Sequence, residues 1–324
     1  MSGEPQAPLV VTVPQALAGM RLDRAVSVLT GLSRSAAAAL VDCGRVRVDG
    51  RPVVHRSAPL AAGSELLAQL PAVSVPLEPD ASVPFEVLYE DGDLVVVDKP
   101  AGVVVHPGAG TREGTLIAGL LARHPEIADL GSISDPARPG VVHRLDKGTS
   151  GLLVVAMSAV AYRSLVAQMS ARAVGRRYLA LVTGIVADDR GIVDAPVGRS
   201  ARTPTKMAVT PAGRAARTGY AVVGRFDHLF GPLGRVTRPA SLLACTLETG
   251  RTHQIRVHLA AIGHPVVGDD RYGAQSPRVL PAGRVFLHAT ALSISHPVTG
   301  APMSWTSPLP PDLRAVLEGA AGTR

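Results

Sequence analysis

The chain of 324 residues is poor in cysteine and aromatic residues and has no long apolar run. Its two cysteines, Cys43 and Cys245, lie far apart in sequence. They can build neither a disulfide framework nor a cysteine-based metal site, which fits a reducing cytosol. No apolar stretch approaches the ~20 residues of a membrane-spanning helix. The first 20 residues contain Glu4 and Pro5 and lack the basic start and apolar core of a signal peptide. We therefore expect a cytoplasmic protein that does not insert into membranes.

Acidic residues are outnumbered by basic ones: the formal charge is +7 and the sequence pI is about 10.0. Basic side chains neutralise phosphates and release counterions, so this excess favours a nucleic acid partner. A simple contribution to solubility is the alternative. Residues 195–226 favour the first interpretation, because they contain six basic side chains, Arg202 and Lys206 among them, and no acidic one. Arg202 and Lys206 are therefore candidate nucleic-acid-binding residues.

The clearest boundary lies between Leu70 and Pro84, where four prolines predict an extended linker. The expected organisation is a small domain followed by a large one. The boundaries that we predict are an extension over 1–14, the small domain over 15–70, the linker over 71–84, the large domain over 85–313 and a tail over 314–324.

The small domain is predicted to contain two helices and a hairpin. Residues 22–29 have apolar residues at helical spacing, and a second helix is expected through 36–41 with Ser33 or Ser35 as its cap and Gly44 at its end. The hairpin is expected to run from 46–48 through the tight-turn pair at 49–50 and back through 53–54.

Seven arginines decorate this small domain, and Arg34, Arg45 and Arg47 are the ones we expect to contact backbone phosphates. The strings RLD at 21–23, LSRS at 32–35 and GRVRVDG at 44–50 resemble the S4 RNA-binding domain. This resemblance covers about residues 15–70. The alternative is an ordinary helical domain with arginines on its surface.

The large domain is expected to be rich in strands with few helices. Helices fit 115–123 and 159–169, the second with Ser158 as its cap. Strands are predicted at 87–89, 94–97, 151–156, 177–182, 242–247 and 285–294. Helices are too few for a doubly wound parallel sheet, so we predict an α+β fold with a mixed, mainly antiparallel sheet flanked by helices.

Three clusters carry chemical groups. Residues 141–154 read VVHRLDKGTSGLLV, which predicts two strands joined by a rigid, glycine-containing loop that presents Asp146. Beside Arg144 and Lys147, Asp146 should stay ionised and serve as a nucleophile or a base. A surface turn with an ordinary ion pair is the alternative.

The second cluster, RRYLALV at 176–182, places Tyr178 at the start of a strand after two cations, where it could stack on a base while Arg177 holds phosphates. The third, ETGRTHQIRVHL at 248–259, predicts a helix from about Thr252, with Arg251 at its start available to a carboxylate. Its two histidines are five residues apart, too far around a helix to share a ligand face, so we expect no metal site.

Together these clusters resemble the RluA/RluD-type pseudouridine synthases, and the resemblance covers about residues 85–312. An S4 domain ahead of the catalytic domain is also an arrangement of this family. Mild departures are Arg176-Arg177, where a lysine before the tyrosine is common, and Met303, where an aromatic is usual. Further matching strings are KPAG at 99–102, VHPG at 105–108, GTL at 114–116, GHP at 263–265, GDDRYG at 268–273, LHA at 287–289 and HP at 296–297.

The resemblance implies conversion of uridine to pseudouridine in folded RNA, with Asp146 as the catalytic residue. Arg251 matches the arginine that pairs with this aspartate, and Tyr178 the tyrosine that packs on the target base. Arg144 matches the residue that fills the place of the flipped base. His143 is a candidate RNA contact beside it, with a role in shaping the loop as the alternative. The reaction loses no atoms and involves no net redox change, so no cofactor is expected. Whether Asp146 attacks C1′, adds to C6 or removes a C2′ proton stays open.

Large-subunit ribosomal RNA of the 23S type is the expected substrate, and transfer RNA is the alternative. A ribosome-assembly factor without catalysis is a rival, although Asp146, Tyr178 and Arg251 are all present. A glycoside hydrolase needs two acids flanking one bond, whereas Asp146 is a single acid in basic surroundings. With no coiled coil or long amphipathic stripe, a monomer is expected.

Overall fold

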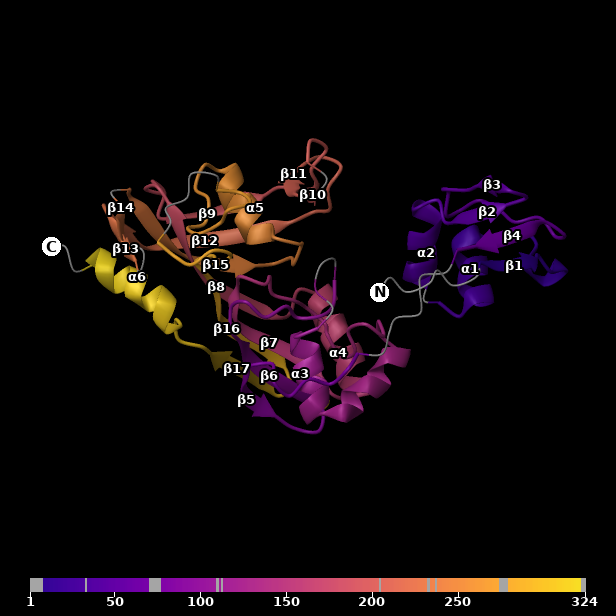
Figure 1. Cartoon of the computed structure of the whole chain (residues 1–324), viewed down its shortest axis with the longest axis horizontal. Coiled ribbons are helices and arrows are strands. Elements are labelled where there is room, and N and C mark those ends of the chain that lie inside the picture. Colours follow the sequence, from indigo (N-terminus) through magenta and orange to yellow (C-terminus); the bar gives the residue numbers. More distant parts are fainter. Residues whose placement is uncertain are drawn as a thin grey trace. The chain divides into compact units, whose positions relative to one another are not determined.

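The computed structural model describes residues 8–32, 34–69, 77–108, 111, 113–203, 205–231, 234–236, 238–273 and 279–321. These residues belong to two compact units that divide between Val75 and Pro76 (Figure 1). The division falls inside the predicted linker. Among the described residues, no helix combines the length and the apolar character needed to cross a bilayer.

The first unit combines a four-stranded antiparallel sheet with two helices. Apolar side chains at helical spacing on α1 and α2, such as Val26 and Val41, pack on Leu66 of the sheet. The strands follow the order β1-β4-β2-β3. The elements are β1 (Leu9–Thr12), η1 (Gln15–Leu17), α1 (Leu22–Thr30), α2 (Arg34–Asp42), β2 (Val46–Val48), β3 (Arg51–Pro52) and β4 (Glu65–Ala68).

The predicted helices and tight turn are present in this unit, but two boundaries differ. Residues 1–14 were expected to precede the domain, but Leu9–Thr12 form strand β1 of its sheet, because their backbone pairs with β4. The hairpin returns through Arg51–Pro52 rather than 53–54, directly after a turn whose Asp49 and Gly50 have φ of 49° and 74°. Ser33, one predicted cap of α2, lies outside the described residues, and Ser35 falls within the helix.

The second unit is built on a nine-stranded sheet among the described residues, in the order β5-β6-β7-β16-β8-β15-β12-β9, with β17 paired to β16. All of its pairings are antiparallel except β16 with β7, which confirms the predicted mixed sheet. Two further pairs, β10 with β11 and β13 with β14, form separate two-stranded sheets. The strands of the unit are β5 (Glu86–Glu90), β6 (Leu94–Lys99), β7 (Ser150–Ala156), β8 (Gly175–Thr183), β9 (Arg190–Asp194), β10 (Val197–Arg199), β11 (Met207–Val209), β12 (Arg217–Phe226), β13 (Leu229–Gly231), β14 (Gly234–Val236), β15 (Ala240–Leu247), β16 (Leu287–Ser295) and β17 (Pro302–Thr306).

Helices cover both faces of the β6–β7 part of the sheet, which explains why these two strands are almost continuously apolar. Successive side chains of a strand point to opposite faces, so Val95 packs with Leu116 of α3 while Val96 packs with Leu165 of α4. Figure 1 shows α3 and α4 beside this part and α5 beside β12 and β15. The helices are α3 (Leu116–Arg123), η2 (Pro125–Ser132), α4 (Ala159–Ser170), α5 (Gln254–Ala261) and α6 (Pro311–Ala321).

Helix α4 begins at Ala159 as predicted, and α3 begins one residue later than predicted, because Thr115 caps it instead of forming its first turn. The Thr115 hydroxyl accepts from the Ala118 amide at 3.3 Å, and the Ser158 hydroxyl accepts from the Ala161 amide at 3.1 Å.

The outer boundaries of the large domain were predicted too tightly. Residues 77–84 were expected to be linker, but Val83 is buried against α3, where Gly119 leaves it room. The tail expected over 314–324 continues α6, whose Val316 is fully buried in the main core.

Candidate active site

A cleft of about 550 Å³ in the second unit brings the three predicted clusters together. Its lining comes from the loop before β7, the start of β8 and the turn after β15. The lining residues are His106, Arg138, Val141, Val142, His143, Arg144, Asp146, Met169, Ser170, Arg172, Arg176, Tyr178, Leu247, Glu248, Thr249, Gly250, Arg251 and Thr252.

Asp146 lies on a loop that its glycines make possible. A Cβ at Gly148 would lie 2.2 Å from the Gly283 carbonyl oxygen. Gly151 has φ of 112°, and a Cβ there would lie 2.3 Å from the Ala289 carbonyl oxygen. The loop is less regular upstream than predicted: residues 141–142 form no strand, and Val141 makes only a single bridge to Val155.

The partner of Asp146 is Arg256, not Arg251. The Arg256 guanidinium donates from Nη1 to Asp146 Oδ2 at 2.9 Å, whereas Arg251 donates from Nε to the Ala215 carbonyl at 3.1 Å. Arg251 lines the cleft, but it makes no ion pair with Asp146. The prediction for Arg251 was wrong because Arg256 lies inside α5, where the helix directs it toward the aspartate loop.

Arg256 is itself held by a second aspartate. Its Nε donates to Asp269 Oδ2 at 2.6 Å and its Nη2 to Asp269 Oδ1 at 2.9 Å, a two-bond pair with fixed geometry. Asp269 is fully buried and also accepts from the amides of Arg271 and Tyr272. Burial alone would raise its pKa, but the hydrogen bonds and charge of Arg256 outweigh burial and lower it.

Two aromatic groups complete this side of the cleft. The Arg256 guanidinium lies 5.2 Å from the centre of the Tyr272 ring, and the Tyr272 hydroxyl is 2.7 Å from His253 Nδ1. His253 Nε2 is 3.8 Å from Asp146 Oδ1. Helix α5 starts at Gln254, not near Thr252 as predicted, and the residue before it, His253, has φ of 55°. Such strain concentrates at functional sites.

The second histidine of this motif serves the fold instead. His258 is fully buried, with Nδ1 2.9 Å from the Thr218 hydroxyl and Nε2 2.9 Å from the Ala195 carbonyl. The two histidines therefore face different partners, as their spacing predicted.

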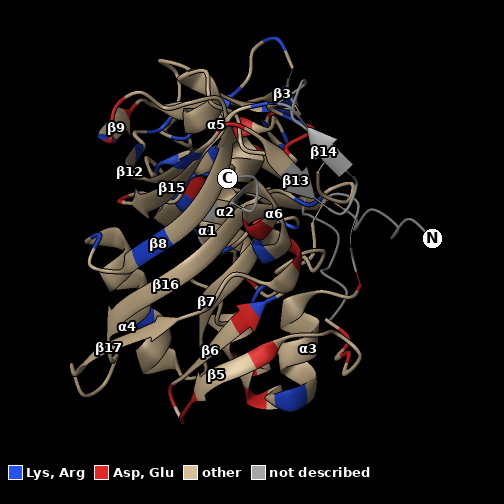
Figure 2. Cartoon of the chain, turned by 90° about the vertical axis from the view of Figure 1, so that its left-hand side faces the viewer, with Lys and Arg blue, Asp and Glu red and all other residues tan. Residues whose placement is uncertain are grey.

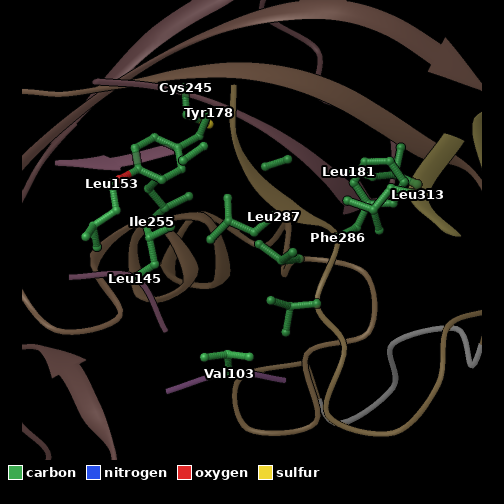
Figure 3. Close-up of a cluster of buried hydrophobic side chains, with 14 of the residues drawn as sticks. Val103, Leu145, Leu153, Tyr178, Leu181, Cys245, Ile255, Phe286, Leu287 and Leu313 are labelled. Carbon is green, nitrogen blue, oxygen red and sulfur yellow. The ribbon is translucent and has the colours of Figure 1, made fainter. Parts of the chain in front are cut away.

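Tyr178 is buried close to Asp146, among core side chains that include Leu145, Leu153, Cys245 and Ile255 (Figure 3). Burial raises the pKa of its phenol to about 12, so the hydroxyl is neutral at physiological pH. A small extension of the cleft, about 50 Å³, is lined by Tyr178, Asp146 and Arg256 together.

The candidate RNA-binding residues around the cleft differ in exposure. Arg144 is exposed, with Nη1 3.3 Å from His106 Nε2. Arg177 is exposed and Arg176 is buried, because neighbours on β8 alternate between faces. Figure 2 shows the blue basic segment that this pair forms on β8.

His143 has a structural partner, in agreement with the alternative that it shapes the loop. Its Nε2 accepts from the Val154 amide at 3.1 Å. Burial, followed by repulsion from Arg176, lowers its pKa to about 3. The imidazole is therefore neutral and brings no positive charge to RNA.

The remaining candidates lie outside the cleft lining. Arg202 is exposed, and Lys206 donates from Nζ to the Arg271 carbonyl at 2.7 Å. In the first unit, Arg34 lies 3.4 Å from Asp23, while Arg45 and Arg47 are exposed.

Two buried cations lie near the Asp146 loop and were not predicted as site residues. Lys99 is fully buried and donates from Nζ to the carbonyls of Pro100 and Val103, at 2.8 and 2.9 Å. Burial and the charge of Arg284 lower its pKa to about 7. Arg284 donates to the Gly148 carbonyl at 2.7 Å and to the Ser150 hydroxyl at 3.0 Å, directly after Asp146.

Among the described residues, Asp91, Asp93 and His296 place possible metal-ligand atoms within 4.8 Å of one another. Protein groups already use these side chains. Asp91 accepts from the Tyr89 hydroxyl at 2.6 Å, and Asp93 accepts from the Ser158 hydroxyl at 2.6 Å. The group therefore serves the β5–β6 turn and the start of α4.

Known proteins are similar to this chain in sequence and fold. Residues 93–261 match the family described as RNA pseudouridylate synthase. Ribosomal large subunit pseudouridine synthase D of Nitrosomonas europaea is 41% identical over 98% of this chain and 89% of its own length. The enzyme of the same name from Pseudomonas aeruginosa is 42% identical over 93% of this chain and 92% of its own. The solved structure of human RNA pseudouridylate synthase domain containing 1 is 30% identical, covers 73% of this chain and 89% of its own, and has a TM-score of 0.56. These matches confirm the resemblance seen in the motifs, and the chain belongs to the RNA pseudouridylate synthase family.

Proposed function

We propose that this protein converts selected uridines of large-subunit ribosomal RNA into pseudouridines. The observation that carries the proposal is the position of Asp146, which lies in the cleft in contact with Arg256 and close to Tyr178. The choice of RNA follows the names of the relatives that are 41% and 42% identical over nearly the whole chain.

Asp146 is the proposed catalytic residue. Pseudouridine formation breaks the bond between C1′ and uracil N1, turns the base and joins C1′ to C5. The site must therefore supply a nucleophile or base near C1′ and retain the free uracil. An ionised carboxylate meets the first need, and Arg256 orients it through the bond at 2.9 Å. Because the reaction is balanced without added atoms or electrons, we propose that it proceeds without a cofactor.

The target base has to leave the RNA stack to reach Asp146, at a cost of a few kcal/mol. Tyr178, whose ring is packed in the core, offers a rigid surface beside the carboxylate for the flipped uracil. The exposed side chain of Arg144, two residues before Asp146, is the group that we propose fills the vacated place in the stack.

The first unit is proposed to act as an S4-like RNA-binding domain. Its exposed Arg45 and Arg47 lie on and beside β2, where phosphates can approach them from solvent. We further propose that the protein works as a monomer in the cytoplasm.

Tritium release tests this function. Transcripts of large-subunit ribosomal RNA and of transfer RNA, labelled at uridine C5, are incubated with the wild type, Asp146→Asn and the matched control Asp188→Asn, an exposed aspartate. We expect release from the ribosomal transcript. Asp146→Asn should lose it by about 10²–10⁴-fold while still binding RNA, and Asp188→Asn should keep it.

Other outcomes separate the parts of the proposal. Release from transfer RNA alone would keep the chemistry and overturn the substrate. Binding of ribosomal RNA without release by the wild type would point to an assembly factor. Release by Asp146→Asn at the wild-type rate would remove Asp146 from its catalytic role.

A further inference from the structure

Two arginines are buried beside the cleft, and only one of them has acidic partners. Arg256 bonds to both Asp146 and Asp269. Arg176, on β8, is only 7% exposed and lines the cleft. Its Nε is buried without a hydrogen-bond partner, and its guanidinium makes no ion pair with any described residue. Within the described part of the chain, Arg176 is thus a buried cation without a counter-charge.

Such an arrangement is unfavourable for the protein alone. Taking a charged group out of water is unfavourable unless hydrogen bonds and an opposite charge compensate. Burial lowers the pKa of Arg176, and its neighbour His143 cannot supply an opposite charge, since an imidazole is either neutral or positive. An anion that enters the cleft would supply the missing charge.

The surroundings leave room at the guanidinium. A Cβ built on Gly250 would lie 2.7 Å from Arg176 Nη1, so the glycine permits the guanidinium to occupy its position. Two other arginines of the cleft lining have acidic partners: Arg138 lies 3.1 Å from Asp135, and Arg172 lies 3.7 Å from Glu248.

We propose that Arg176 binds a backbone phosphate of the RNA, belonging to the target uridine or to a nucleotide next to it. Arg176 and Tyr178 are two residues apart on one strand, so their side chains point to the same face about 7 Å apart. A phosphate at Arg176 would therefore position the flipped base against Tyr178 and Asp146. This inference rests on the proposed function and adds a positioning residue to it.

Salt-dependent binding of a radiolabelled large-subunit ribosomal RNA transcript tests the role of Arg176. The variants are Arg176→Met, which keeps the apolar stem, Arg176→Lys, which keeps a charge, and the control Arg163→Met, an exposed arginine on α4. We expect Arg176→Met to raise Kd about tenfold and to reduce the slope of log K against log salt by about 0.7–0.9, the value for one phosphate. Arg176→Lys should recover most of the slope, and Arg163→Met should leave Kd and slope within twofold of the wild type.

The urea unfolding midpoint distinguishes RNA binding from a structural role of Arg176. If Arg176 stabilised the fold, Arg176→Met would lower this midpoint. Because Arg176 is an uncompensated charge in the free protein, Arg176→Met should keep or raise the unfolding midpoint while RNA binding weakens. Gly250→Ala keeps the charge but displaces the guanidinium, and it should raise Kd by less than Arg176→Met without changing the slope.

The wild type separates the two proposals. If the wild type releases no tritium from either RNA, the proposed function fails. If it releases tritium and Arg176→Met binds RNA with wild-type Kd and slope, only the phosphate contact is overturned. A clear fall of the unfolding midpoint in Arg176→Met, with an unchanged salt slope, would likewise assign Arg176 to structure.

Discussion

The two buried arginines, Arg256 and Arg176, carry the same charged group but differ in whether acidic side chains surround it. Arg256 has one carboxylate on each side, and its partner Asp269 takes two further hydrogen bonds from backbone amides. Arg176, two residues before Tyr178 on β8, has no carboxylate partner among the residues that the structure describes. The charge of Arg256, which orients Asp146, is compensated by carboxylates of the protein itself. The charge of Arg176, which we propose binds an RNA phosphate, has no such compensation among the described residues.

The difference also predicts opposite effects on stability. Burial pulls the pKa of Arg256 down, but Asp269 and Asp146 outweigh it and raise the pKa of Arg256 above its usual value. The pKa of Arg176 is lowered, because burial meets no such compensation. Removing the first charge should therefore harm folding, and removing the second should not.

The largest effect is expected for Arg256→Met. This change leaves Asp269 fully buried without its partner, and breaking a buried pair costs about 3–5 kcal/mol. It also frees Asp146, so tritium release should fall at least about 10²-fold. Urea unfolding and tritium release measure the two losses, with Arg176→Met as the matched control. Equal unfolding free energies for the two variants would contradict the inference that Arg256 is compensated inside the protein and Arg176 is not.

A smaller effect is expected for Asp269→Asn, which keeps the shape but removes one charge from the pair. Arg256 should lose its fixed orientation toward Asp146, so kcat should fall about tenfold while KM changes little. The neighbouring Asp270→Asn is the control, because Asp270 is exposed. A rise in KM with unchanged kcat would show that Asp269 acts in RNA binding instead.

The sequence predicted the sheet, most of its strands and the three clusters around Asp146, because local patterns encode them. Short runs of apolar residues marked β6 and β15, and Ser158 marked the start of α4. Domain edges were less predictable. Strand β1 and the end of α6 are short apolar segments whose structure depends on distant partners, β4 and the main core.

Within the site, the sequence predicted which segments meet but not which arginine reaches Asp146. Arg251 and Arg256 stand five residues apart in one motif, and the choice depends on where α5 begins. One signal was available: His253 and Arg256 are three residues apart, a spacing that places side chains on one helix face. Both do lie within 4 Å of Asp146.

Burial of charge could not be predicted from local pattern either. Nothing in KPAG or RRY distinguishes the buried Lys99 and Arg176 from the exposed Arg177. Their burial follows from the packing of strands that are far apart in sequence.

Lys99 should make the stability of the protein depend on pH. It is a second buried cation without an ion pair among the described residues. Its pKa falls from 10.5 to about 7 on folding. A lowered lysine pKa means that the unfolded chain binds more protons between these values, so stability rises with pH across this window. From pH 7 to pH 9 the unfolding free energy should rise by about 2 kcal/mol from this group. Lys99→Met should lose this rise, and Lys147→Met, an exposed lysine, should retain it.

The smallest expected effect is on the pH dependence of stability through His143, whose pKa is lowered in part by the charge of Arg176. Burial first, and the charge of Arg176 second, lower its pKa from 6.5 to about 3. Its neutral Nε2 accepts from the Val154 amide, so the unfolded chain takes up a proton before the folded one does. Stability should therefore fall as pH drops below 6.5, by about 1 kcal/mol between pH 7 and pH 5.5. Urea unfolding of His143→Gln, which keeps an acceptor without a titrating group, should lack this fall.

In Arg176→Met the loss of stability at low pH should persist but be smaller, because the pKa of His143 rises once the neighbouring charge is removed. An identical pH profile in the wild type and Arg176→Met would mean that the charge of Arg176 is already compensated in the free protein.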